Sequence, residues 1–191
     1  MRCLSVTEAA DLLGGLGFSI LSQSGRNSLR LRSGIVSAQA RTQGSPPIAC
    51  WLSDFAAALI RWHTNDGARL LWIDHWGDLI QSAQAFVMAA RVGLGETRSL
   101  SEAPGHYFDP HPYNKRYPPD VSAAHAQELS VMIGFIVAMI VNQWDGWLID
   151  TNSTERIEFW EGNVLFYSAD KKHLAASQSI LDGFGCDPKM Q

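Results

Sequence analysis

Two short segments carry side chains that can bind metal ions or transfer protons. The segment HYFDPH, residues 106–111, has the pattern H-x-x-D-x-H formed by His106, Asp109 and His111. The segment DHWGD, residues 74–78, contributes Asp74, His75, Trp76 and Asp78. Imidazole and carboxylate groups are common ligands of zinc and iron, and a His/Asp pair can act in acid–base catalysis. One interpretation is therefore a small metal-dependent hydrolase built on His75, His106, Asp109 and His111.

The same residues also fit a purely structural role. The stretch from 104 to 119 holds five prolines and three tyrosines, a composition typical of a stiff loop with tyrosines on its surface. Its histidine spacing matches no strong zinc signature. We therefore expect the loop to be architectural, and we predict no metal site, no catalytic residue and no cofactor. The secondary candidates for contact with a partner are Asp74, His75, Trp76, Asp78, His106, Tyr107 and Tyr113.

Motifs of the common enzyme classes are not found in the sequence. It has no G-x-S-x-G nucleophile turn, no Walker loop for phosphate and no G-x-G-x-x-G dinucleotide motif. The three cysteines, Cys3, Cys50 and Cys186, form no CxxC pair and are typical of core thiols in a reducing compartment. We therefore predict a protein that is not an enzyme.

The segment RIEFWEG, residues 156–162, is the best candidate for a binding surface. Alternation along a strand buries Ile157 and Phe159 and turns Arg156, Glu158 and Trp160 outward. An outward tryptophan among carboxylates is typical of a hot spot for a cationic protein partner. The alternative is that Trp160 packs beneath the helix that follows the hairpin 155–168. The predicted contact residues are Asp150, Glu155, Arg156, Glu158, Trp160 and Glu161.

Charge is unevenly distributed along the chain, whose formal net charge is −4. Residues 1–95 contain eight Arg and six acidic residues, a balance of +2, whereas residues 96–191 contain seven basic and thirteen acidic residues, a balance of −6. No basic cluster is present to neutralise phosphates, so a nucleic-acid partner is not expected. The acidic half suits a basic protein partner, although an acidic solvated surface explains the same balance.

Hydrophobic periodicity predicts both helices and strands. The expected helices are one capped by Ser5 and running to Leu16, one ending near Trp62, one capped by Asp78, one capped by Ser122 and running to about Gln143, and one from Asp170 to about Leu181. The expected strands are 18–22, 28–32 and 35–41 as an N-terminal meander, RLLWID (69–74), WLID (147–150) and a C-terminal hairpin turning at Gly162-Asn163. This order predicts an α+β fold with antiparallel strands and about five helices.

Length and hydropathy predict one domain. The 191 residues suffice for a single domain, 1–191, with two sub-lobes, 1–95 and 96–191, as an option within one shared core. The most apolar run, VMIGFIVAMIV (131–141), has eleven residues, whereas about 20 are needed to span a bilayer. We expect a long buried central helix there and no membrane partner. The first residues lack an apolar signal-peptide core, so a cytoplasmic location is expected.

Two stretches of the sequence resemble bacterial proteins that are encoded beside secreted polymorphic toxins. They are ARVGLGETRSLSEAPGHYFDP (90–110) and WDGWLIDTNSTERIEFWEGNVLFYSA (144–169). The chain resembles an immunity protein of the kind that accompanies type VI or contact-dependent toxins, over about a third of its length. The resemblance implies a non-enzymatic protein that binds a cognate toxin in the cytoplasm and occludes its active site. The metal-dependent hydrolase and a chaperone-like accessory protein are the alternatives.

Overall fold

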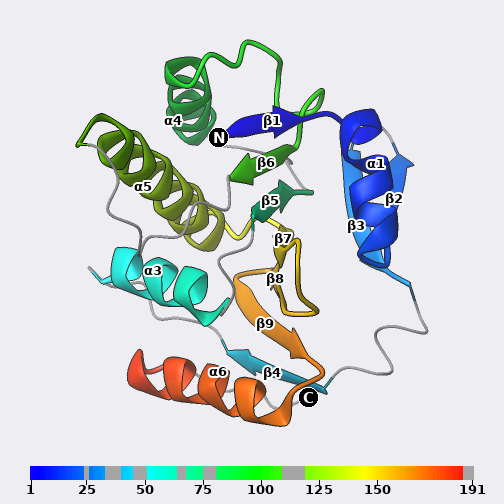
Figure 1. Cartoon of the computed structure of the whole chain (residues 1–191), viewed down its shortest axis with the longest axis vertical. Helices are drawn as coiled ribbons and strands as arrows, with labels where there is room; N and C mark the ends of the chain where they lie inside the picture. Colours follow the sequence, from blue (N-terminus) through cyan, green and yellow to red (C-terminus); the bar gives the residue numbers. More distant parts are fainter. Residues whose placement is uncertain are drawn as a thin grey trace.

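Two antiparallel sheets form the framework of the protein (Figure 1). The structure is a computed structural model that describes residues 1–23, 26–32, 40–44, 51–63, 68–74, 81–108 and 119–186. The larger sheet contains, in spatial order, β1 (Arg2–Leu4), β6 (Gly105–Phe108), β5 (Arg69–Ile73), β7 (Gly146–Asp150), β8 (Arg156–Trp160), β9 (Asn163–Ser168) and β4 (Ala40–Gly44). The smaller sheet is the hairpin of β2 (Phe18–Gln23) and β3 (Arg26–Leu31). The predicted α+β fold is confirmed.

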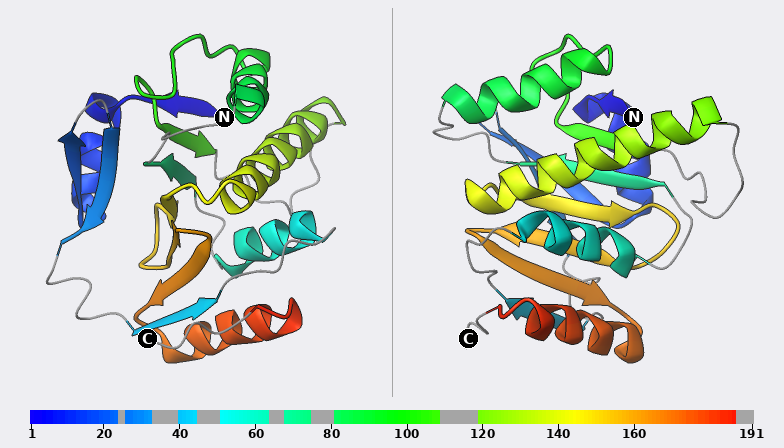
Figure 2. Two further views of the ribbon diagram at one scale, coloured as in Figure 1. Left: turned by 180° about the vertical axis from the view of Figure 1, so that it is seen from behind. Right: turned by 90° about the vertical axis from the view of Figure 1, so that its left-hand side faces the viewer.

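The helices cover the larger sheet from both sides (Figures 1 and 2). They are α1 (Val6–Gly15), α3 (Leu52–Trp62), α4 (Gln81–Gly93), α5 (Pro119–Val141) and α6 (Lys171–Gly183). Helices α3, α5 and α6 pack on one face, and α4 lies beside α5 near β1. Helix α1 and the β2–β3 hairpin stand on the opposite face. Alternate residues of β5, β7 and β9 therefore enter two separate hydrophobic clusters, one on each side of the sheet.

The most apolar segment forms the second half of the long helix α5. Its side chains Phe135 and Ile136 are fully buried in the cluster between sheet and helices, whereas Val141 is 47% exposed. No helix among the described residues is long and apolar enough to cross a membrane. The helix begins at Pro119, so the predicted cap at Ser122 is wrong. Proline fits a first helical turn because the amide hydrogen that it lacks would have no partner there.

Two local signals in the sequence are confirmed by hydrogen bonds. The side chain of Ser5 accepts from the amide of Glu8, and the carboxylate of Glu8 accepts from the amide of Ser5, which is a complete capping box. The C-terminal hairpin is also present, but its two turn residues are Glu161 and Gly162, one position earlier than predicted. Both have positive φ, and the side chain of Asn163 closes the turn by donating to the carbonyl of Trp160 at 3.0 Å.

The predicted N-terminal meander is wrong in its third strand. Strand β4 pairs with β9, so that Ala40 lies opposite Ser168, and of the three expected strands only the first two, β2 and β3, pair with each other. Residues 33–39 lie outside the described residues. Strands β1 and β6 were not predicted from the sequence. Strand β6 lies near the start of the stretch 104–119, which is rich in proline and tyrosine. It lies between β1 and β5, and both of its edges are paired.

Candidate functional site

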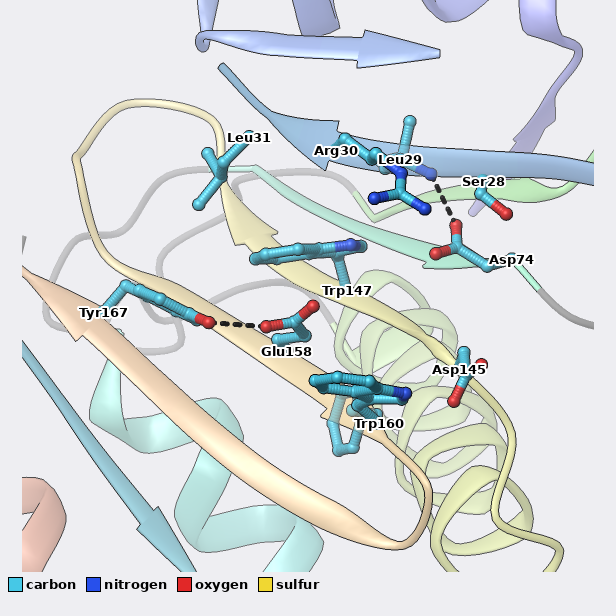
Figure 3. Close-up of a pocket in the computed structure, with 11 residues that line it drawn as sticks. Ser28, Leu29, Arg30, Leu31, Asp74, Asp145, Trp147, Glu158, Trp160 and Tyr167 are labelled. Atoms are coloured by element: carbon cyan, nitrogen blue, oxygen red, sulfur yellow. Dashed lines mark hydrogen bonds between the residues drawn. The ribbon is translucent and has the colours of Figure 1, made fainter. Parts of the chain in front are cut away.

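A pocket of about 350 Å³ opens between β3 and strands β7 to β9, on the face of the large sheet that carries α1 (Figure 3). Its wall from β3 consists of Ser28, Leu29, Arg30 and Leu31. The large sheet supplies Asp74, Asp145, Trp147, Glu158, Phe159, Trp160 and Tyr167. The described part of the pocket wall therefore combines three carboxylates, one arginine and three aromatic side chains with polar atoms.

Strand register explains why these side chains meet. Glu158 on β8 lies directly opposite Trp147 on β7, so the two side chains share one face of the sheet. Trp160 follows Glu158 by two residues and emerges on the same face. Ile157 and Phe159 alternate with them and are buried among the helices on the other face. The predicted orientations of these four β8 residues are confirmed.

Trp160 is a large apolar side chain in the pocket wall, and it is 53% exposed. The helix that follows the hairpin, α6, contacts β4 and β9, and its Leu174 and Leu181 belong to the cluster on the opposite face. The alternative in which Trp160 packs beneath this helix is therefore wrong. An exposed indole beside a hollow is available to a partner.

Among the described carboxylates of the pocket, Asp74 is the most deeply buried. It is 8% exposed, and its Oδ1 accepts a hydrogen bond from the amide of Leu29 at 2.9 Å. Burial raises the pKa of Asp74 to about 8, and the negative charges of Asp145 and Glu158 act in the same direction. Asp74 is therefore mainly in its neutral form at pH 7, although it belongs to a site that is acidic by composition.

The other two carboxylates of the pocket are half-buried and are held by neighbouring groups. Glu158 accepts a hydrogen bond from the hydroxyl of Tyr167 at 2.5 Å (Figure 3). Asp145 accepts from the amide of Glu161, in the hairpin turn, at 3.1 Å. These contacts fix the direction of both carboxylates without removing either one from the pocket wall.

Two of the predicted contact residues lie inside the protein. Arg156 is 4% exposed, donates to the carbonyl of Leu16 and lies over the ring of Phe18. It was expected to point outward, and this expectation is wrong because Phe18 at the start of β2 covers the start of β8. Asp150 is fully buried, and its Oδ1 accepts from the amide of Asn152. Neither side chain is accessible to a partner.

Glu155 and Glu161 complete the set of predicted contact residues. Glu155 is half-buried and accepts from the hydroxyl of Ser168 at 3.2 Å, outside the pocket wall. Glu161 is exposed in the hairpin turn, next to Trp160. The pocket also contains residues that sequence reasoning missed, namely Arg30, Trp147 and Tyr167. Only the pairing of β7, β8 and β9 indicates that Trp147 and Tyr167 share the face of Glu158.

His106 is a packing residue of strand β6. It is fully buried, its Nε2 lies 3.2 Å from the guanidinium of Arg91, and its Nδ1 lies 3.3 Å from the carbonyl of Leu71. Because arginine can only donate, Nε2 is the acceptor and Nδ1 carries the proton. Burial lowers the pKa of His106 to about 3, and the charge of Arg91 adds to this effect. Both ring nitrogens are thus occupied by the protein itself.

The remaining secondary candidates do not form a cluster in the described part of the chain. Tyr107 is half-buried, and the guanidinium carbon of Arg2 lies over its ring, 4.7 Å from the ring centre. The residues His75, Trp76, Asp78, Asp109, His111 and Tyr113 lie outside the described residues. Among the described residues, no group of three or more His, Cys, Asp and Glu side chains could hold a metal ion.

Comparison of the chain with models of protein families, with curated proteins and with solved structures finds no match. The function is therefore inferred from the pocket and its surroundings.

Proposed function

We propose that the protein is a bacterial immunity protein, which binds a cognate secreted toxin in the cytoplasm and occludes the active site of that toxin. The observation that carries the proposal is the half-exposed Trp160, which stands beside Glu158 and Glu161 at the border of an acidic pocket. The resemblance of segments 90–110 and 144–169 to proteins encoded beside polymorphic toxins supports the same function.

The physical properties of this surface suit tight binding of a basic protein. Carboxylates around the pocket attract a positively charged surface and raise the rate of association. A tryptophan that loses its water on binding slows dissociation. A standard inhibitory interface buries about 1,200–2,000 Å² in total, so contacts must extend beyond the pocket to the neighbouring hairpin turn and β3.

The proposal is tested by co-expression with the product of the neighbouring gene, which the proposal expects to be a toxin. The wild-type chain should restore growth of cells that produce the toxin. Trp160→Ala should weaken binding by about 2 kcal/mol or more, mainly through faster dissociation. Trp51→Ala is the matched control, since Trp51 is 44% exposed at the start of α3, on the opposite face of the sheet.

The effect of charge on the rate of association with the toxin is measured separately. Glu161→Lys should slow association with the toxin, and the difference from wild type should shrink as salt is added. Asp182→Lys on α6 makes the same charge change away from the pocket and should leave the association rate nearly unchanged. If the product of the neighbouring gene is not toxic, or if the wild-type chain gives no protection against it, the proposed function is wrong.

A further inference from the structure

We propose that the pocket between β3 and strands β7 to β9 receives the guanidinium group of an arginine side chain on the partner protein. This inference rests on the proposed function and specifies the chemistry by which the same surface recognises its target. It is carried by the aromatic wall of the pocket, by its carboxylates and by its shape.

Two indole rings flank one carboxylate in the pocket wall. Trp147 lies across from Glu158 on the neighbouring strand, and Trp160 lies two residues further along β8 on the same face (Figure 3). Tryptophan attracts cations more strongly than the other aromatic residues, and a flat guanidinium group can stack on its ring. A guanidinium group that enters the pocket therefore meets aromatic surface and a carboxylate together.

The charge of the pocket favours a cation. Asp74, Asp145 and Glu158 line it, and Arg30 is the one cationic side chain among the described residues of its wall. Asp74 is more than nine-tenths buried, one of its oxygens is engaged by the amide of Leu29, and the other points into the pocket (Figure 3). A bound cation would stabilise the ionised form of Asp74, which burial alone disfavours.

Shape and acceptor positions favour arginine over lysine. The acceptors are spread over three neighbouring strands of the large sheet, because Asp74 follows β5, Asp145 precedes β7 and Glu158 lies on β8. Opposite these acceptors, Leu29 and Leu31 of β3 form an apolar part of the pocket wall. Strand β3 is held there by its pairing with β2. A guanidinium group presents five donors in a plane, whereas an ammonium group is compact and strongly hydrated. A volume of about 350 Å³ admits one long side chain.

The pocket chemistry can be measured on the full chain without the toxin. The probe is N-acetyl-L-arginine methylamide, and the readout is the indole N–H signals of Trp147 and Trp160 in nitrogen–proton NMR spectra, assigned with Trp147→Phe and Trp160→Phe. The arginine probe should shift both signals to saturation. The lysine analogue should bind at least about fivefold more weakly. The citrulline analogue has the same shape without the charge and should cause no saturable shift.

Variants identify the carboxylates that hold the probe. Glu158→Gln and Asp145→Asn should each weaken binding of the arginine probe at least about fivefold. Asp54→Asn removes an exposed carboxylate on α3, on the opposite face of the sheet, and should bind as wild type does. Because Glu158 holds Tyr167, thermal unfolding of Glu158→Gln is measured as well, and Asp145→Asn provides the independent test.

Four results would overturn the inference: no saturable shift with the arginine probe, equal binding of the arginine and citrulline probes, binding of lysine as tight as that of arginine, or wild-type binding by both pocket variants. The outcome is separable from that of the proposed function. If the chain protects cells against the toxin but does not bind the arginine probe, the proposed function stands and the arginine pocket is wrong. If the chain binds the arginine probe selectively but gives no protection, the pocket chemistry stands and the immunity function is wrong.

Discussion

Asp74 makes stability depend on pH in a direction that is unusual for an aspartate. Its pKa is raised from 3.8 to about 8, chiefly because the carboxylate is buried. Between these two values the folded chain holds one proton more than the unfolded chain. The free energy of unfolding therefore decreases as the pH rises through this window, and the stabilising contribution is fully present only below pH 4.

The magnitude follows from the difference of one bound proton. Each pH unit inside the window changes the free energy of unfolding by about 1.4 kcal/mol per proton. Between pH 5 and pH 7 the wild-type protein should therefore lose roughly 2–3 kcal/mol relative to Asp74→Asn. The asparagine keeps an oxygen that can accept from the amide of Leu29 but does not titrate. Comparing the two proteins cancels the contributions of titrating groups that do not interact with Asp74, and leaves those of Asp74 and its charged neighbours Asp145 and Glu158.

Urea unfolding at pH 5, 6 and 7, followed by tryptophan fluorescence, measures the effect. The difference in unfolding free energy between wild type and Asp74→Asn should change steadily over this range. Asp54→Asn, which removes an exposed carboxylate, should follow the wild-type pH dependence. A difference between wild type and Asp74→Asn that stays constant within about 0.5 kcal/mol would refute the reasoning. Asp74 would then be ionised in the folded protein throughout the range.

Two further predictions concern the core. Ile136→Ala should lower the free energy of unfolding by about 2–5 kcal/mol, because Ile136 is fully buried beneath the sheet; Val141→Ala, at a position 47% exposed, is the control, and a loss below about 1 kcal/mol at Ile136 would place the helix outside the core. The imidazole of His106, whose pKa is lowered to about 3, should stay neutral from pH 5 to pH 8 in proton NMR titrations, and an inflection in that range would contradict its burial beside Arg91.

Much of the fold could be predicted because many of its signals are local. The capping box at Ser5 and Glu8, the alternation in β8 and the hairpin between β8 and β9 each depend on residues a few positions apart. Such patterns indicate which segments are helices and strands. They do not indicate which strands are neighbours, and this is why β4 was assigned to a meander although its partner is β9.

The site was predicted from local sequence patterns, which explains both the correct and the wrong expectations. The alternation in β8 was enough to predict that Glu158 and Trp160 share one face. It could not show that β2 covers the start of β8, so Arg156 was expected outside although Phe18 encloses it. His106 was considered as a ligand because histidine has that chemistry, but its position opposite Leu71 and beside Arg91 makes it part of the core.

The order of strands has a consequence for the way in which the chain folds during synthesis. Strands β1, β4 and β5 precede residue 75, yet among the strands that the structure describes each pairs within the large sheet only with strands that follow residue 104. A nascent chain that ends before β6 can form helices and the β2–β3 hairpin, but none of the ladders of the large sheet. Closing these long loops is entropically costly and slows folding. The ribosome must therefore release β7, β8 and β9 before the framework of the protein, and the pocket with it, can assemble.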